Sequence, residues 1–326
     1  MAVIRRNILK DATARNDFIE GVLRLKATMS SRTTGWYAIP GPDQQLSLYD
    51  SFVVDHIQVT RRAIPPGGDW LMRNIAHRSP SFLPWHRRML VSLEATMQRA
   101  LGKPNFALPY WDWQTDADSG APEEAAIWGN DYLGPAGDPV DSGPFRFRNN
   151  PRPFVVRVVA DPLGRWASVQ QGLRRQFGEA ATSLPDSEDV KTVLADYPTY
   201  DQAGFDRNSD GFRNRLEGFL PPGESRMHNR VHDWVGGDMI PISSPNDPVF
   251  FLHHCNVDRI WESWMSEYGR SYLPGMDGPP PVYGGMRIDD IIPLSLSDGY
   301  PADDPPTPRR SLDMTALYGY DQLVSG

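Results

Sequence analysis

The apolar residues of this chain recur mostly at intervals of three or four positions, the period of an α-helix. Residues 166–177 and 186–196 show this spacing and predict helices. Residues 11–29 predict another, whose inward face is made of Phe18, Val22, Leu25 and Met29. By contrast, residues 154–159 are rich in valine and predict a short strand. A mainly helical chain with a few short strands is therefore expected.

Two further helical stretches place a histidine on their apolar face. The first lies near residue 50, where one side is shared by Tyr49, Phe52 and His56. The second opens at residues 83–86 and is followed by Gly102, a typical helix stop. Its apolar face is made of His86, Leu90, Leu93, Met97 and Leu101. Each stretch thus points an imidazole at the protein interior.

Between these helices the chain predicts long irregular segments. It contains 31 prolines and 28 glycines, which favour turns and loops. Residues 114–152 are rich in glycine, proline and aspartate and predict a long loop, and from about residue 275 the tail is rich in proline and aspartate. No internal repeat or linker interrupts the pattern. We therefore expect one domain over residues 1–326, built around a four-helix core.

Charge and composition exclude several classes of protein. The net charge of −8, from 33 basic and 41 acidic residues, argues against a nucleic-acid partner. No apolar run approaches the length of a membrane span, so no membrane partner is expected. The first residues lack the apolar segment of a signal peptide, and the single cysteine, Cys255, makes no intrachain disulfide. We expect a cytoplasmic protein, or one exported with a partner protein.

Histidine is the most informative residue type in the chain. The seven histidines form an early group of three and a late group of four: His56, His77, His86, His228, His232, His253 and His254. A single buried histidine is usually a hydrogen-bonded core residue, but several in one interior are costly unless a metal binds them. Ligation by nitrogen alone suits copper, zinc, iron or nickel.

The late group combines two pairs. His228 and His232 are four residues apart and share one face of a helix. A zinc protease would need glutamate after the first histidine, but Asn229 stands there. In the second pair, His254 lies in an apolar stripe with residues 250, 257 and 261, while His253 lies in another with residues 249 and 260. Periodicity therefore leaves open which of the two is a ligand. We also expect Asn246 to cap this helix and Pro248 to lie in its first turn.

Five segments together resemble the type 3 copper proteins, most closely bacterial tyrosinases and o-aminophenol oxidases. They are residues 77–88 (HRSPSFLPWHRR), 108–113 (LPYWDW), 209–218 (SDGFRNRLEG), 228–232 (HNRVH) and 246–261 (NDPVFFLHHCNVDRIW). The resemblance implies a helical bundle with a copper A region at about 45–102 and a copper B region at about 205–268. His56, His77 and His86 would bind copper A, and His228, His232 and His254 would bind copper B.

The resemblance also implies a function. Such proteins use O₂ at two copper ions to hydroxylate monophenols and to oxidise o-diphenols to o-quinones. One alternative is a catechol or o-aminophenol oxidase without significant monophenol hydroxylation. An alternative from another class is a haemocyanin-like O₂ carrier, although the short chain is more similar to the enzymes. The substrate partner is a small phenol, and a small copper-delivery protein is a possible second partner.

Other residues receive roles from the same resemblance. Glu217 and Asn229 match a pair thought to hold a water that helps to deprotonate monophenols. Asp258 is expected either to orient a ligand histidine or to form a surface salt bridge. Asp233 follows the second copper B histidine, where it either favours amino-substituted phenols or is a solvent-facing charge. Cys255 is expected to be a small buried apolar residue.

One motif competes with the copper assignment. Residues 206–217 fit the pattern of a calcium-binding loop that ends at Glu217. However, Arg213 occupies a position that is usually apolar, Pro198 and Gly204 disrupt the preceding helix, and there is no second loop of this kind. The copper assignment is therefore preferred.

Overall fold

The computed structural model describes residues 2–61, 75–161, 163–278, 286–292 and 306–325. The α-helices of these residues are α1 (Ala12–Ala27), α2 (Leu48–Thr60), α3 (Phe82–Leu101), α4 (Trp113–Asp118), α5 (Ser187–Asp196), α6 (Phe212–Glu217), α7 (Met227–Val235), α8 (Val249–Tyr268) and α9 (Pro308–Leu312). The strands are β1 (Val3–Arg5), β2 (Met29–Thr33), β3 (Gln45–Ser47), β4 (Val156–Ala160), β5 (Trp166–Gln171) and β6 (Tyr318–Tyr320). The mainly helical fold expected from the sequence is confirmed.

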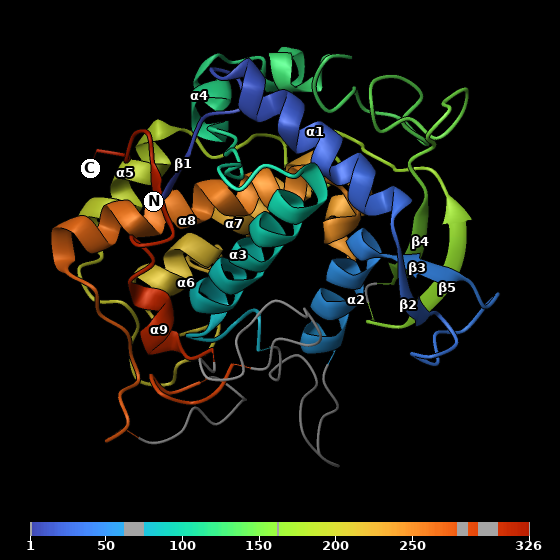
Figure 1. The fold of residues 1–326 in the computed structure, drawn as a ribbon. Coiled ribbons are helices and arrows are strands. Elements are labelled where there is room, and N and C mark those ends of the chain that lie inside the picture. The colour runs from blue at the N-terminus through green and yellow to red at the C-terminus, as the bar shows by residue number, and fades with distance from the viewer. Residues whose placement is uncertain (1, 62–74, 162, 279–285, 293–305, 326) are drawn as a thin grey trace.

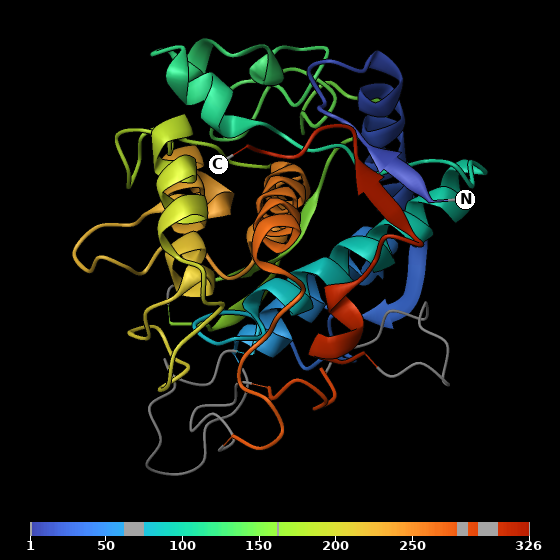
Figure 2. The ribbon, with the colours of Figure 1, turned by 90° about the vertical axis from the view of Figure 1, so that its left-hand side faces the viewer.

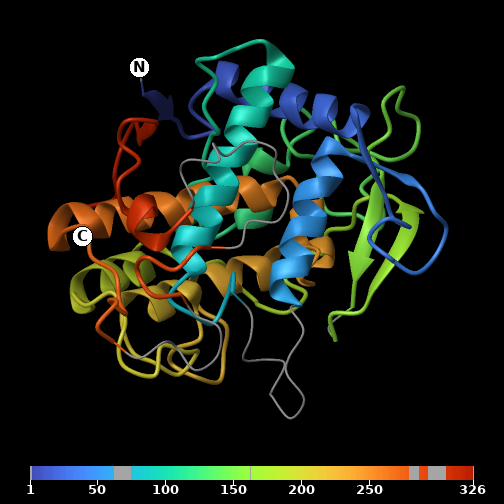
Figure 3. The same cartoon turned by 60° about the horizontal axis from the view of Figure 1, so that its bottom comes forward.

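The helices that carry histidines meet in the middle of the molecule. In Figure 3, α2 and α3 stand side by side, while α8 crosses behind them. Helix α3 packs against α8 and α1, and α7 packs against α8. One hydrophobic cluster runs through all of these helices, from Ile8 to Leu312. No helix in the described residues is both long and apolar enough to cross a bilayer.

Local sequence signals define the ends of α2 and α3. Helix α2 begins with a capping box, because Ser47 Oγ accepts from the Asp50 N–H while Asp50 accepts from the Ser47 N–H. Helix α3 ends at Gly102, whose φ of 67° suits a residue without a side chain. These two signals place His56 and His86 on rigid, well-defined helices.

The start of α8 corrects one expectation. Asn246 does not cap the helix, because its side-chain amide donates 2.7 Å to the Val158 carbonyl instead. Asp247 accepts from the Val249 N–H at 3.0 Å and forms a buried ion pair with Arg175. Pro248 stands at the N-cap position, immediately before the first turn of α8.

A β-hairpin replaces one of the predicted helices. Residues 166–177 begin with strand β5, which pairs antiparallel with β4. The prediction was wrong because Trp166 and Val169 suit a strand as well as a helix, and cross-strand pairing with the valines of β4 decides between them. The strand predicted at residues 154–159 is confirmed as β4, and the helix predicted at 186–196 is confirmed as α5.

Two smaller predictions also need correction. Helix α1 ends at Ala27, so Met29 is the first residue of β2 and its side chain is 41% exposed. The loop predicted at residues 114–152 is interrupted by α4 and by 3₁₀ turns at Pro122–Glu124 and Ala126–Trp128. Part of the tail after residue 275 lies outside the described residues.

The two ends of the chain lie side by side. Strand β1 pairs in parallel with β6, so that Val3 is opposite Tyr318 and Arg5 is opposite Tyr320. Figure 1 labels β1 close to the C-terminal segment, and Figure 2 shows the two strands as neighbouring arrows. The tail therefore packs back onto the helical core.

Asp258 of α8 joins this pair of strands to the core. Its carboxylate accepts from Arg87 Nε at 2.5 Å, from Arg5 Nη1 at 3.2 Å and from the hydroxyls of two tyrosines, Tyr318 and Tyr320. Burial alone would raise the pKa of Asp258, but the two arginines hold it below its ordinary value. Asp258 thus orients no histidine and forms no surface salt bridge, which corrects both sequence expectations.

We predict that Asp258→Ala destabilises the protein by about 3–5 kcal/mol, because two buried guanidinium groups lose their counter-charge. Chemical denaturation measures this change. The matched control is Asp289→Ala, which removes a solvent-exposed ion pair with Arg309 and should cost far less stability. Equal losses in the two variants would contradict the role of Asp258 as a buried hub.

Candidate metal centre

The early group of histidines comes from two helices and the segment between them. His56 lies on α2, His86 lies in the first turns of α3, and His77 precedes α3. Although 30 residues of sequence separate the first from the last, one ligand nitrogen from each lies within 4.8 Å of the other two. This spacing suits three ligands of one metal ion.

The late group comes from α7 and α8. His228 and His232 share one face of α7, and His253 and His254 lie on the facing helix. The Nε2 atom of His228 is 3.1 Å from Nε2 of His232 and 3.3 Å from Nε2 of His254. Three imidazoles therefore converge on one point through the same ring atom.

Backbone carbonyls set the orientation of several rings. The Nδ1 atom of His56 lies 2.7 Å from the Ile242 carbonyl oxygen. The Nδ1 atom of His86 lies 2.9 Å from the Phe82 carbonyl oxygen, and that of His232 lies 2.7 Å from the Met239 carbonyl oxygen. A carbonyl oxygen only accepts, so each Nδ1 carries the proton and each Nε2 presents a lone pair. The Nδ1 atom of His228 likewise lies 3.3 Å from the carbonyl oxygen of Glu217, so the Nε2–Nε2 contact between His228 and His232 brings two acceptors together.

Such an arrangement is unfavourable unless a cation lies between the nitrogens. The Nε2 atoms of His56 and His86 are also buried and make no hydrogen bond with any described residue. Unsatisfied buried acceptors are rare and costly in proteins. Nitrogen lone pairs that converge without protons are, however, the donor set of a metal ion such as copper. The histidines therefore fit a pair of such ions.

Both His253 and His254 are buried, and both belong to the late cluster, whose ligand atoms lie within 4.8 Å of one another. The Nε2 atom of His254 points at that of His228, as described above. The ring of His253 instead stacks beside His228, with centroids 5.0 Å apart, and neither of its nitrogens makes a hydrogen bond with a described residue. The assignment of His254 as the ligand stays a prediction of the family resemblance.

The two groups adjoin each other. The ring of His86 stacks on that of His254, with centroids 4.1 Å apart and an angle of 9° between the planes. Burial lowers the pKa of His56 to about 3 and that of His232 to about 4. All of these imidazoles are therefore neutral at pH 7, the form that binds metals.

A cavity of about 240 Å³ opens above the histidines. Its wall includes His56, His77, His228 and His232, and the apolar part comes from Phe219, Ile240, Pro241 and Ile242. Asn229 and Asp233 of α7 also line it, together with Arg78. A small molecule with one aromatic ring thus has access to both histidine groups.

The sequence comparisons agree with this geometry. The sequence profile described as the common central domain of tyrosinase matches residues 46–267. The chain is 38% identical to the tyrosinase of Streptomyces lincolnensis over 278 residues, which cover 84% of this chain and 89% of that protein. It is 31% identical to grixazone synthase of Streptomyces griseus subsp. griseus over 99% of this chain and 100% of that protein.

The chain belongs to the tyrosinase family of type 3 copper proteins. Its fold is also similar to that of a polyphenol oxidase from Thermothelomyces thermophila, with a TM-score of 0.71 at 21% identity over 98% of this chain and 89% of that one. Proteins of the family bind two copper ions, and the two histidine groups fit such a pair.

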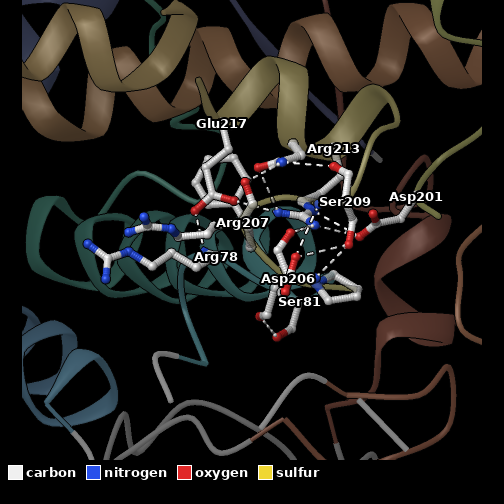
Figure 4. A network of polar contacts seen from close by, with 12 residues as sticks. Arg78, Ser81, Asp201, Asp206, Arg207, Ser209, Arg213 and Glu217 are labelled. Carbon is white, nitrogen blue, oxygen red and sulfur yellow. Dashed lines mark hydrogen bonds and ion pairs between the residues drawn. The ribbon is translucent and has the colours of Figure 1, made fainter. Parts of the chain in front are cut away.

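Glu217 is completely buried and is not among the residues that line the cavity. Its Oε1 accepts from the Arg78 N–H at 2.5 Å, and its Oε2 accepts from Arg213 Nη1 at 3.0 Å. Figure 4 shows Arg213 lying between Glu217 and Asp201, which form a buried ion network. Burial raises the pKa of Glu217 to about 7 although Arg213 opposes the shift. Asn229 lies nearer to the metal centre, with Oδ1 3.0 Å from Nδ1 of His228.

Sequence reasoning missed the supports of this region. Arg78 has a φ of 59°, a left-handed conformation that is unusual for a residue with a side chain. The Glu217 carboxylate accepts a hydrogen bond from the N–H of Arg78 and so fixes the backbone immediately after His77. The motif around residues 77–88 indicated a functional segment, but no pattern in the sequence points to this contact.

The acidic residues of the calcium-loop motif form contacts within the protein. Asp206 accepts from the backbone N–H groups of Asn208 and Ser209, and Asp210 pairs with Arg215. Glu217, which would be the last calcium ligand, is engaged by Arg213 and by the Arg78 N–H. These contacts do not favour a calcium site.

The pKa of His56 predicts a pH effect on the metal-free protein. Because its pKa falls from 6.5 in the unfolded chain to about 3 in the folded one, the unfolded state binds one more proton below pH 6.5. This histidine should therefore cost roughly 2 kcal/mol of stability between pH 7 and pH 5.

Buried acids such as Glu217 act in the opposite sense, so the comparison needs a variant. After chelation, His56→Gln should lose about 2 kcal/mol less than the wild type between these two pH values. Urea denaturation at both pH values measures the difference. The same pH dependence in both proteins would show that His56 is protonated equally in the folded and unfolded states.

Proposed function

We propose that this protein is a copper-dependent phenol oxidase that hydroxylates monophenols and oxidises o-diphenols to o-quinones. The observation that carries the proposal is the convergence of unprotonated imidazole nitrogens beneath a cavity that fits one aromatic ring. Bound copper supplies the redox chemistry between the phenol and O₂. An o-diphenol loses two electrons and two protons, and leaves as an o-quinone.

The ligands are assigned from both the geometry and the family pattern. His56, His77 and His86 would hold copper A, and His228, His232 and His254 would hold copper B. The support is that each set brings its nitrogens together, and that carbonyl oxygens fix the protonation of several rings. The remaining histidine of the copper B region, His253, is then a neighbour that packs beside the ligands.

The cavity wall binds and orients the phenol. Phe219 and Ile242 offer apolar surface to the faces of an aromatic ring, while the imidazole end of the cavity is polar. A phenol therefore enters with its oxygen towards the histidines and its substituent towards the mouth. The small volume limits side reactions by leaving little room for water.

Glu217 and Asn229 are proposed to assist hydroxylation. A phenol has a pKa of about 10, so its deprotonation at pH 7 costs roughly 4 kcal/mol. Asn229 lines the cavity, and the buried Glu217 accepts from the N–H of Arg78, another lining residue. A water oriented by this pair would accept the phenolic proton, as a positioned base does.

Two alternatives remain distinct from this function. The similarity to grixazone synthase supports considering an o-aminophenol or catechol oxidase that does not hydroxylate monophenols. Haemocyanin-like O₂ carriage is disfavoured, because the similarity to a functional unit of octopus hemocyanin, with a TM-score of 0.53 at 17% identity, concerns the fold alone.

The wider setting of the enzyme is also a proposal. Residues 1–326 would form one catalytic domain, and the continuous hydrophobic cluster supports this division. A small copper-delivery protein is proposed as a partner, beside the phenolic substrate. We place the enzyme in the cytoplasm, or outside the cell after export with such a partner.

The function is tested by copper content and turnover together. The purified wild type should contain two copper ions per chain and oxidise 4-methylcatechol in air with consumption of O₂. His254→Ala should lose copper B and its activity, because the converging nitrogen is removed, whereas His253→Ala should keep two copper ions and measurable turnover. A protein that binds O₂ reversibly without oxidising the catechol would be a carrier, and exchanged results for the two variants would move the ligand to His253.

Hydroxylation is tested with a monophenol and its matching catechol. Glu217→Gln and Asn229→Ala should lower monophenol turnover by about 10²-fold, the typical contribution of a positioned base, and catechol turnover much less. Asp201→Asn is the matched control, because it weakens the same buried ion network on the far side of Arg213. Proportional loss of both activities in the Glu217 and Asn229 variants, with copper still bound, would mean that the pair has only a structural role.

A further inference from the structure

Asp233 stands where the fold by itself disfavours a carboxylate. It lies in the last turn of α7, at the negative end of the helix dipole, and is only partly exposed. Its side chain accepts a hydrogen bond from the Ser225 hydroxyl. No basic side chain of the described residues lies within ion-pair distance of it, because Arg226 pairs with Glu224 and Arg230 pairs with Asp189.

The same residue faces the substrate cavity. Asp233 follows His232 and lies one helical turn beyond Asn229, so that Asn229 and Asp233 share the face of α7 that lines the cavity. Ser225 lies on the same wall. A half-buried anion that forms no ion pair among the described residues is costly to hold there, and functional sites are where such local costs are retained.

We propose that Asp233 binds the ammonium group of the substrate, so that this enzyme prefers phenols with a basic amino group on a short side chain. The proposal rests on the proposed phenol oxidase function and deepens it. A phenol whose oxygen faces the histidines directs its para substituent to the mouth, beside α7. The cavity of about 240 Å³ lies below the usual range of about 300–1,000 Å³ for ligand sites, which favours a single ring with a short chain.

A competing explanation is that Asp233 offsets the positive charge of the metal centre. That role would affect every phenol alike, whereas recognition of an ammonium group would affect only cationic ones. The two explanations are therefore separated by the ratio of the kcat/KM values for two substrates in one variant, because a general loss of activity cancels in that ratio.

The test uses three catechols with two-carbon side chains: dopamine, which is cationic; 4-ethylcatechol, which is neutral; and 3,4-dihydroxyphenylacetate, which is anionic. In Asp233→Asn the kcat/KM ratio of dopamine to 4-ethylcatechol should fall about tenfold or more, the effect of losing a charge-assisted hydrogen bond. In Asp233→Lys the preference should pass to the anionic catechol. Asparagine keeps an acceptor for Ser225, so its effect reports the charge.

Asp196→Asn is the matched control. Asp196 is also an aspartate at the end of a helix, the last residue of α5, but it is exposed and lies outside the cavity. Its removal should leave the ratio unchanged. A ratio that stays within about twofold of the wild type in Asp233→Asn, or that falls equally in Asp196→Asn, would overturn the proposal.

A binding measurement separates this result from the proposed function. Calorimetry on the copper-loaded protein under nitrogen compares tyramine with 4-ethylphenol, which lacks the amine, without turnover. The wild type should bind tyramine more tightly, and Asp233→Asn should reduce that advantage about tenfold. If no catechol is oxidised, the proposed function fails while this comparison still decides the role of Asp233; equal affinities in the wild type would overturn it.

Discussion

The arrangement of this protein depends on burying a group of uncharged imidazoles in one apolar interior. Burial keeps them neutral, as the lowered pKa values of His56 and His232 show. Their protons are then directed by carbonyl acceptors, and two of these, Met239 and Ile242, lie in the segment between α7 and α8. One orients a histidine of the late group and the other a histidine of the early group. A single connecting segment thus sets the geometry of both halves of the metal centre.

Buried ion pairs hold the surrounding helices in place. Arg87 follows His86 on α3 and meets Asp258, which lies one turn after His254 on α8. Arg213 joins Glu217 to Asp201 beside α7. Such pairs contribute little net stability because desolvation offsets their attraction, but each permits only one placement of its partners. The helices that carry histidines are therefore positioned by contacts that need no metal, which preorganises the site.

The cavity combines apolar side chains with polar and charged groups. Neutral imidazoles line it together with Asn229, Asp233 and Arg78. The imidazoles suit the chemistry shared by the tyrosinase family, to which the chain belongs. We propose that the carboxylate of Asp233 is the group through which this protein distinguishes one phenol from another.

Much of the framework was predictable from the sequence, because helix period and local signals act over a few residues. The helices around His56, His86 and His254 follow from apolar spacing, and the one around His228 from its four-residue distance to His232. Ser47 and Gly102 define ends of two of these helices. The grouping of the histidines and the five motifs indicated a copper protein of this family. Residues 166–171 were mistaken for a helix because their apolar spacing suits both structures, and only pairing with β4 decides.

Periodicity does not distinguish His253 from His254, since both positions are buried on the same helix. The contacts of Asp258, Glu217 and Arg78 were decided by the tertiary structure. Asp258 contacts Arg87, which is 171 residues away in the sequence, and Arg5, which is 253 residues away. The Ile242 carbonyl that orients His56 is 186 residues away. The sequence by itself indicated the helices that carry the histidines and that these histidines meet in their midst. Only the folded chain decided which nitrogen each ring presents, because the groups that hold the ring protons come from distant segments.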